Sequence, residues 1–534
     1  MDRVRDWIVV HRPRIWQKSK QIHSSQAPAM AEVARRRGRA TGQSRDCARG
    51  GDPRGGVRSA TVGRGDPRGG NPSCAPRSKR PLATRLGSSA PRSSLRELSE
   101  AGWQAAFNVQ EFQGCSVGEA DGQLCLVASR DAEAGDVLLR VPIDETLSEA
   151  KFEELFPGAA KDGSLDGLET WMKLVVVLMR FRSDESEGKW RPLLEALDSA
   201  SFRKHPLLWN KEDLLELQCS QTFEKLKAYN MYLESTWQQI EEFVLPVVGM
   251  QGACGRDDFF WAFGALKTNA LRPFSQPQAL RLVPMLSFLS HSRRPNCNTK
   301  FASSGIFKKE ETLDLVAMSP LRKGDVLLYD FDPQKNEIDV LVDYGTFDLE
   351  GPSRGMELTL EIDENDPLYD DKCDVLEEAG LEAPRHSFAV AEGEGDQMIP
   401  EDALAFLRLC HLNGMDSFLL ESVFRNDVWG FMKEPVSKEN ESKVCESMIR
   451  SCEEALAEFP TTVEQDKEII GGLAGSRGCR ATLAVEARLT EKLSLRGLLA
   501  CFKTERAQIP FKEYYQERRL KSLDLLDMDG NSTY

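Results

Sequence analysis

Two stretches of the chain concentrate side chains that could take part in group or proton transfer. The first, Val283–Asn298, reads VPMLSFLSHSRRPNCN and contains His291. The second, Gly324–Phe347, reads GDVLLYDFDPQKNEIDVLVDYGTF and contains Tyr329 and Tyr344. Imidazole and phenol groups can hold a reacting group through hydrogen bonds. Considered alone, each tyrosine is more simply a strand residue that packs in the core with its hydroxyl satisfied.

Motifs for several other chemistries do not occur. The sequence contains no P-loop, no HExxH and no GxSxG. Its thirteen cysteines include no CxxC pair, so neither a disulfide framework nor a zinc ribbon is indicated. The cysteine pattern therefore predicts free, mostly buried thiols in a reducing compartment, and no metal site is expected.

Charge divides the chain into two unlike parts. Residues 1–95 carry 21 Lys and Arg against 6 Asp and Glu, a net charge of +15. Of the 69 basic and 84 acidic residues in the whole chain, 48 and 78 remain for residues 96–534, a net charge of −30. Nucleic-acid binding depends on basic residues that neutralise phosphates, so the acidic part favours a basic protein partner instead. The longest dense apolar run, Leu174–Met179, is far shorter than the ~18 residues of a membrane helix, so no membrane partner is expected.

The basic segment 1–95 does not have the composition of a folded domain. It is rich in Arg, Gly, Ser, Ala and Pro, and the hexapeptide GDPRGG occurs at 51–56 and again at 65–70. An Arg-rich, Ser-rich and acid-poor leader is typical of an organellar transit peptide. A disordered basic tail, an RNA-binding RGG-like segment, or a true start at Met30 remain alternatives.

The remaining chain alternates between strand and helix patterns. Strands are expected at Leu124–Ser129 and Asp136–Val141, as a hairpin or two adjacent strands, and again at 313–317, 324–330 and 357–362. The stretch Ile338–Tyr344 continues the second of the two chemical stretches. Apolar residues at three and four spacing predict helices. These helices are expected at 168–179, 211–217, 223–237, 259–271, 401–412, 437–458 and 481–502, with an acidic loop at 363–374. The predicted class is α+β, with a helical insertion between strands and an all-α C-terminal part.

Together, the two chemical stretches resemble the SET-domain protein methyltransferases. The first resembles the signature NHSxxPNC, and the second resembles the closing SET strands with a downstream Tyr-Gly. Further matches point to the Rubisco large-subunit lysine methyltransferase-like subfamily and run from about residue 100 to 505. They are LCLVASRDAEAGDVLLRVP at 124–142, KWRPLLEAL at 189–197, HPLLWNKEDLLELQCS at 205–220, FFWAFGALKTNALR at 259–272 and DPLYDDK at 366–372.

The resemblance implies three units and an activity. A SET domain is expected at 96–355, with its helical insertion at about 165–265, followed by a helical substrate-binding domain at 356–534. The implied reaction is methyl transfer from S-adenosylmethionine to a lysine of a protein substrate, with histidine as an alternative acceptor. The family also favours plastid over mitochondrial or cytoplasmic location for a chain with this leader.

The resemblance also assigns individual residues. Tyr329 matches the tyrosine at the methyl-transfer channel, and Tyr344 matches the downstream tyrosine that lines it. His291 matches the histidine of an Asn-His pair whose backbone contacts the adenine of the donor. Cys297 matches a cysteine that binds zinc in some SET proteins, but no partner cysteines follow, so a buried thiol is expected.

Several donor and substrate positions depart from the family pattern. The glycine-rich turn reads Gly122-Gln123-Leu124-Cys125, with Cys125 in place of the second glycine. The Ser-Arg-Ala-Phe motif reads Thr268-Asn269-Ala270-Leu271, so the arginine that contacts the donor carboxylate is Asn269. The asparagine of the Asn-His pair is Ser290, and two substrate-side positions, an arginine and an aspartate, are Pro273 and Ser287. These changes leave a second hypothesis open, that of a catalytically degenerate SET fold that acts as a protein-binding module.

Overall fold

A computed structural model describes the chain between residues 114 and 525. Its gaps lie at 121–122, 163–164, 166, 184–189, 192, 195–196, 198–204, 272–279, 305–309, 347, 349–350, 391–397, 422–426 and 473–479. The predicted leader 1–95, Gly122 and Pro273 lie outside the described residues.

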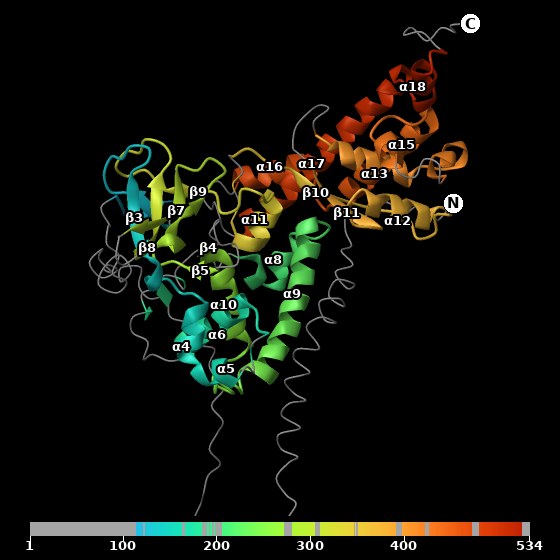
Figure 1. Ribbon diagram of the computed structural model, residues 1–534. Helices are drawn as coiled ribbons and strands as arrows, with labels where there is room; N and C mark the ends of the chain where they lie inside the picture. The colour runs from blue at the N-terminus through green and yellow to red at the C-terminus, as the bar shows by residue number, and fades with distance from the viewer. Residues whose placement is uncertain are drawn as a thin grey trace, which may run out of the picture.

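Short sheets and two-stranded pairs form the N-terminal part (Figure 1). A three-stranded antiparallel sheet has the order β3-β8-β7, and β1-β2, β4-β5 and β6-β9 form pairs. Of these pairs only β6-β9 is parallel. The strands are β1 (Cys115–Ala120), β2 (Gln123–Ala128), β3 (Val137–Pro142), β4 (Ala270–Leu271), β5 (Arg281–Leu282), β6 (Ser290–His291), β7 (Cys297–Ser304), β8 (Glu310–Ala317) and β9 (Leu328–Tyr329).

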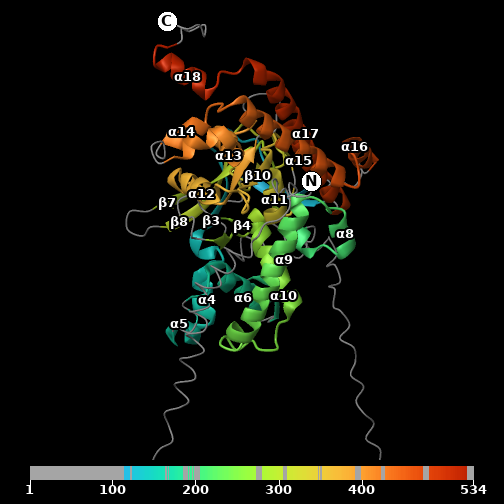
Figure 2. The ribbon, with the colours of Figure 1, turned by 90° about the vertical axis from the view of Figure 1, so that its right-hand side faces the viewer.

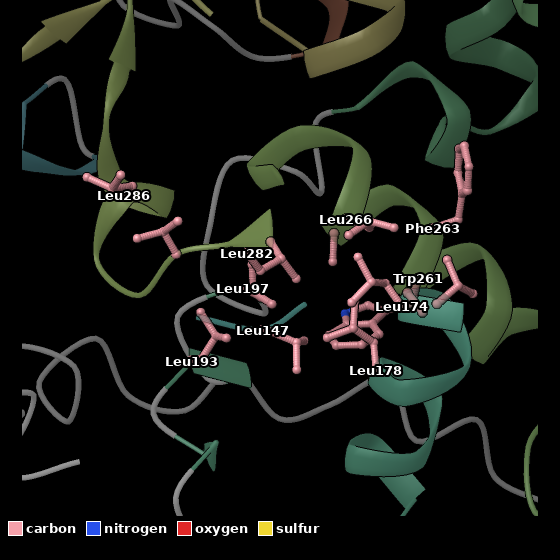
Figure 3. Packing of buried hydrophobic residues seen from close by; sticks show 14 of the residues in the cluster. Leu147, Leu174, Leu178, Leu193, Leu197, Trp261, Phe263, Leu266, Leu282 and Leu286 are labelled. Atoms are coloured by element: carbon pink, nitrogen blue, oxygen red, sulfur yellow. The ribbon is translucent and has the colours of Figure 1, made fainter. Parts of the chain in front are cut away.

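A group of helices separates β3 from β4, and most of it lies below the sheets in Figure 1. Apolar side chains of α6 and α10 meet in its core, where Figure 3 shows Leu174, Leu178, Trp261 and Leu266 together with Leu282 of β5. The helices are α4 (Glu149–Leu155), α5 (Pro157–Asp162), α6 (Thr170–Ser183), α8 (Lys211–Leu215), α9 (Gln221–Gln239) and α10 (Arg256–Asn269). The helices of this group begin at residue 149, whereas the sequence placed the start of the helical insertion at about 165.

The C-terminal part is helical, as expected, and also contains an antiparallel pair of strands, β10 (Met356–Glu361) and β11 (Arg385–Val390). The helices are α12 (Tyr369–Glu378), α13 (Glu401–Cys410), α14 (Val428–Met432), α15 (Lys438–Glu458), α16 (Val463–Gly472), α17 (Arg480–Gln508) and α18 (Tyr515–Ser522). The second half of the expected acidic loop 363–374 is thus the start of α12. None of the helices among the described residues is long and apolar enough to cross a membrane.

The long helix α17 joins the two parts. Its first half places Leu483, Ala484 and Ala487 in the core of the N-terminal part. Its second half places Leu498 and Phe502 in the core of the C-terminal part. Figure 2 shows α17 running from α18 down toward α8. One rigid helix therefore contributes to both hydrophobic cores.

Two strand expectations are wrong. The stretches at 124–129 and 136–141 do not form a hairpin, because β2 pairs with β1 while β3 pairs with β8. Between residues 324 and 330 only Leu328–Tyr329 is a strand. The preceding backbone runs beside β2, where the Leu327 amide donates to the Leu126 carbonyl at 2.8 Å.

The stretch Ile338–Tyr344, grouped with the closing strands, is a helix, α11 (Glu337–Tyr344). Both ends carry standard helix signals. Asn336 is the N-cap and its side chain accepts from the Asp339 amide at 2.9 Å. Gly345 ends the helix in the left-handed conformation at φ 66°. A side chain at Gly345 would also meet the Cα of His205 at 2.8 Å, so glycine is required there for both reasons.

Candidate active site

The two chemical stretches lie side by side. Strand β6 pairs with β9 so that Ser290 is opposite Leu328 and His291 is opposite Tyr329. Asn296 fastens the pair, because its side chain accepts from the Leu328 amide and donates to the Val326 carbonyl, both at 2.8 Å. The fold therefore sets His291 and Tyr329 next to each other although they are far apart in sequence.

Tyr329 lies at the centre of this arrangement and is 7% exposed. Its hydroxyl oxygen is 3.3 Å from Oγ1 of Thr299 on β7. Burial raises the pKa of its phenol, and the hydrogen bond with Thr299 only partly opposes this effect. Tyr329 therefore keeps its proton at neutral pH and can act as a hydrogen-bond donor.

His291 is a neutral, fixed ring. Its Nδ1 accepts from the Phe331 amide at 3.3 Å, which leaves the proton on Nε2. Burial, together with the nearby Arg293 guanidinium, lowers the pKa of His291 to about 4, although Asp330 and Asp348 oppose the shift. The ring is therefore uncharged at neutral pH and does not act as a proton shuttle there.

Phe331 gathers the aromatic residues of the site. Its ring centroid lies 5.2 Å from that of His291, 6.1 Å from Tyr329 and 5.3 Å from Tyr344. These separations are typical of favourable aromatic contacts. Both tyrosines singled out in the sequence thus belong to one apolar wall.

A cluster of charges holds α11 in place beside that wall. The Asp343 carboxylate accepts from Lys267 Nζ of α10 at 2.7 Å and also pairs with Lys335. Burial alone would raise the pKa of Asp343, but the two lysines outweigh it and hold that pKa below its usual value. Since Tyr344 is the next residue, these ion pairs also fix the position of its ring.

The end of α10 presents two of the changed donor positions. Asn269 is 8% exposed, and its amide nitrogen donates to the Ala265 carbonyl at 2.8 Å, one turn earlier in the helix. The neighbouring Thr268 hydroxyl is buried without a hydrogen-bond partner among the described residues. At the position that the resemblance assigns to an arginine, the chain thus has an uncharged amide that is bound to its own helix.

Ser287 lies in a short 3-10 turn, η5 (Leu286–Phe288), which packs against both α10 and β2. The turn follows Met285, whose φ of 72° is rare for a bulky residue. Within the described part of the chain the Ser287 hydroxyl, like that of Thr268, is buried and has no partner. Buried polar atoms are nearly always paired, so two unpaired hydroxyls suit a site that binds a polar ligand.

Strand β2 supplies the remaining expected residues. Leu124 packs at the edge of the core, and Cys125 is 2% exposed. Cys125 lies opposite Gly118 in the β1–β2 ladder. Since Gly122 is outside the described residues, only the second half of the altered glycine turn can be placed.

Cys297 is the buried thiol that the sequence predicted. It is 0% exposed, its Sγ donates to the Leu328 carbonyl at 3.2 Å, and burial raises its pKa to about 12. Within the described residues no group of three or more His, Cys, Asp and Glu side chains could hold a metal ion.

Sequence reasoning missed two residues that organise the site. Asn296 clamps β9, and its only sequence signal was its place in the PNCN run. Arg293 is the other: its side chain is 0% exposed and bonds to the residues that follow Tyr329. Nothing in the local pattern distinguishes Arg293 from its exposed neighbour Arg294.

Comparisons with known proteins identify the family of the chain. Residues 363–493 match the family model described as "Rubisco LSMT substrate-binding". The chain is 30% identical over 467 residues to the chloroplastic [fructose-bisphosphate aldolase]-lysine N-methyltransferase of Arabidopsis thaliana, covering 83% of this chain and 93% of that protein. It is 31% identical over 425 residues to the chloroplastic Rubisco large subunit N-methyltransferase of Nicotiana tabacum, covering 76% of this chain and 82% of that protein.

A solved structure gives the same answer for the fold. The SET domain of a Rubisco large-subunit methyltransferase bound to lysine and S-adenosylhomocysteine superposes with a TM-score of 0.71 at 29% identity. The match covers 82% of this chain and 97% of that structure. The chain therefore belongs to the Rubisco large-subunit methyltransferase-like family of SET-domain protein-lysine N-methyltransferases.

Proposed function

We propose that this protein transfers a methyl group from S-adenosylmethionine to a lysine side chain of a protein substrate, with Tyr329 as its catalytic residue. The observation that supports this most directly is the pairing of His291 with Tyr329, with the Tyr329 hydroxyl directed to Thr299. In a chain of this family, His291 and Tyr329 are thus kept next to each other, although several residues proposed to contact the methyl donor have changed.

The chemistry follows from the properties of the wall that Tyr329, Phe331 and Tyr344 form. A lysine ammonium has no lone pair, so it must lose its proton before it can attack a methyl group. Burial against an apolar wall disfavours the charged amine and lowers its pKa. The protonated Tyr329 hydroxyl can then accept from or donate to the neutral amine and hold it in line.

S-Adenosylmethionine supplies the electrophilic methyl group on its sulfonium. The residues proposed to bind S-adenosylmethionine come from three places. They are Gly122, Leu124 and Cys125 of the altered glycine-rich turn, Asn269, and the backbone of Ser290 and His291. The Thr268 hydroxyl next to Asn269, which has no hydrogen-bond partner among the described residues, supports a polar ligand at this place. One side-chain amide hydrogen of Asn269 bonds to the Ala265 carbonyl, so only the second is left for a ligand. The amide carries no charge.

On the substrate side, Tyr344 and Ser287 are the proposed contacts. The relatives act on aldolase and on the Rubisco large subunit, as their names state, and both are chloroplastic enzymes. Plastid fructose-bisphosphate aldolase is therefore the first substrate to test.

We assign each part of the chain a role. The leader 1–95 directs the protein to the plastid, and the SET domain spans 96–355 with its helical insertion at about 165–265. Residues 356–534 dock the substrate, and the match to the substrate-binding family falls within them.

A calorimetric titration of S-adenosylhomocysteine into the full-length protein tests the proposal, followed by transfer of tritiated methyl from S-adenosylmethionine to aldolase. Micromolar binding together with labelling of a lysine is the expected result. The uncharged, self-bonded Asn269 favours one second candidate, a SET fold that binds a protein partner without methylating it. Folded protein that binds no S-adenosylhomocysteine would establish that alternative over the first.

A further inference from the structure

Arg293 is a buried guanidinium whose donors bond to the chain that follows Tyr329. Its Nε lies 3.1 Å from Glu337 Oε1, and its Nη1 lies 3.0 Å from Asp330 Oδ1. Nη1 also donates to the Asp332 carbonyl at 3.0 Å, and Nη2 donates to the Lys335 carbonyl at 2.5 Å. The side chain is 0% exposed, so these partners replace its hydration.

The two carboxylates that hold Arg293 are themselves held by a third segment. Arg354 bonds to Asp330 Oδ2 at 3.1 Å through Nη2 and donates its backbone amide to Glu337 Oε2 at 3.0 Å. The backbone amide of Arg293 donates to Asp348 Oδ2 at 2.7 Å. Arg293 thus joins three segments: the one that contains β6, the connection from β9 to α11, and residues 348–354.

The place of these contacts along the chain gives them their importance. Arg293 is two residues after His291, and Asp330 is the residue after Tyr329. The ion pair between Arg293 and Asp330 therefore lies at the end of the β6–β9 pair, which has only two residues in each strand. A pair that short gains little from its own backbone hydrogen bonds, so side chains have to support its register: Asn296 at β9 and, at the end of the pair, the buried and multiply bonded guanidinium of Arg293.

We propose that Arg293 is a positioning residue that holds the donor-binding backbone of Ser290 and His291 in register with Tyr329. This inference rests on the proposed methyltransferase function, because it assigns donor binding to that backbone. Arg293 itself touches neither reacting group. It acts through Asp330, Glu337 and the two carbonyls that it joins.

Arg293→Lys tests the inference, since a lysine keeps the charge but cannot reproduce the forked set of bonds. Arg408→Lys is the matched control. Arg408 is also a buried arginine: its Nε donates to Glu441 Oε1 at 2.6 Å, and its Nη1 donates to the Met432 and Lys433 carbonyls at 2.9 and 2.7 Å. Arg408 lies in the C-terminal part, far from the candidate site in sequence. Its substitution therefore measures how much stability is lost when a buried arginine cluster outside the site is broken.

The readouts are the Kd for S-adenosylhomocysteine by calorimetry and amide hydrogen exchange at residues 290–297 and 328–331, both on the full-length protein. A displacement of reacting groups by about 1 Å can lower the reaction rate about 100-fold. We expect Arg293→Lys to raise the Kd about 10-fold or more and to speed exchange in both segments. Arg408→Lys should leave the Kd and that exchange unchanged while lowering the thermal midpoint.

Gly351→Ala provides a second variant in case Arg293→Lys does not fold. A Cβ at Gly351 would meet the Arg293 Cβ at 2.5 Å and Asp348 Oδ2 at 2.8 Å, so the methyl group displaces Arg293 or the carboxylate that holds its backbone amide, without changing any charge. A raised Kd in this variant supports the inference. An unchanged Kd in a folded Arg293→Lys or Gly351→Ala protein overturns it, as does an equal rise in Arg408→Lys. Wild-type protein that binds no S-adenosylhomocysteine overturns the proposed function and the inference together.

Discussion

The phenol oxygen of Tyr329 lies 3.3 Å from the hydroxyl oxygen of Thr299, which connects the short strand β9 to the long strand β7. Tyr329 is therefore held at both ends of its side chain. Its backbone belongs to the β6–β9 pair, and its hydroxyl is directed by a residue of the three-stranded sheet. A phenol fixed in this way can direct a lysine nitrogen without first having to be ordered itself.

Tyr329→Phe removes the hydroxyl and keeps the ring. We expect kcat for methyl transfer to fall about 10- to 100-fold, since a hydrogen bond to a group that carries charge contributes about 1.5–3 kcal/mol. The Kd for S-adenosylhomocysteine should not change. Steady-state tritium transfer to aldolase at saturating substrate measures kcat, and calorimetry measures the Kd.

Tyr514→Phe is the control for that variant. Its hydroxyl donates to the Ile509 carbonyl at 2.5 Å in the C-terminal part, so the substitution also deletes one tyrosine hydrogen bond. It should lower stability by about 1 kcal/mol and leave kcat unchanged. Equal kcat values for Tyr329→Phe and the wild type would remove Tyr329 from its catalytic role.

Asn269→Arg restores a charge at the end of α10. In the absence of a ligand, a buried and unpaired guanidinium is costly, so the thermal midpoint of the free protein should fall. Bound S-adenosylhomocysteine would supply a carboxylate partner, and a charge-assisted bond should tighten binding about 10-fold or more. Calorimetry and thermal shifts with and without the ligand measure both effects. Weaker or unchanged binding would show that the donor carboxylate does not lie near residue 269.

Much of the fold follows from the sequence where structure is local. The helix α17 (Arg480–Gln508) begins one residue before the predicted 481–502 and continues six residues beyond it; its existence and its start are read directly from the apolar spacing. The helix α11 was missed although Asn336 and Gly345 mark its ends, because the Ile, Val and Tyr residues of the short stretch Ile338–Tyr344 fit a strand equally well.

The site is different, because its organising contacts are distant in sequence. Arg293 meets Asp330, Glu337 and Asp348 across separations of 37, 44 and 55 residues. No periodicity connects such positions, and a charged residue in a loop is ordinarily exposed. The family resemblance located Tyr329 and His291, but only the fold explains what holds them together.

Glu491 of α17 makes a buried contact between the two parts of the protein. Its carboxylate accepts from the backbone N–H of Gln221 at 2.7 Å and from the backbone N–H and the hydroxyl of Thr222 at 3.0 and 2.8 Å, all at the start of α9. A negative charge there also suits the positive end of the helix. Glu491→Gln loses the charge and one acceptor, so we expect the free energy of unfolding in urea to fall by about 1–3 kcal/mol.

Glu464→Gln is the matched change at the surface. Glu464 pairs with Arg496 at 2.9 Å, but both side chains are more than half exposed. Exposed pairs contribute little, so its unfolding free energy should match that of the wild type. If Glu491→Gln is as stable as Glu464→Gln, α17 does not hold the two parts together through this carboxylate.

Buried histidines make the stability of the protein depend on pH. His411 in the C-terminal part bonds to the Ser447 hydroxyl at 2.8 Å. Burial lowers its pKa to about 4, and the charges of Lys372, Lys443 and Arg450 act in the same direction, against Asp366. In the unfolded chain the same ring has a pKa of about 6.5. Protons therefore bind more readily to the unfolded state between these values, so stability is full above pH 6.5 and is lost as the pH falls toward 4.

His411→Gln removes this titration and keeps a polar side chain beside Ser447. The linkage amounts to about 2 kcal/mol between pH 7 and pH 5, so the wild type should lose about that much more unfolding free energy over this range than the variant. Urea unfolding at pH 7, 6 and 5 measures the difference. His205 and His291 also have pKa values lowered to about 4, and they remain in the variant, so its stability should still fall with acid. Parallel curves for the two proteins would mean that His411 is protonated in the folded state, against its burial and its cationic neighbours.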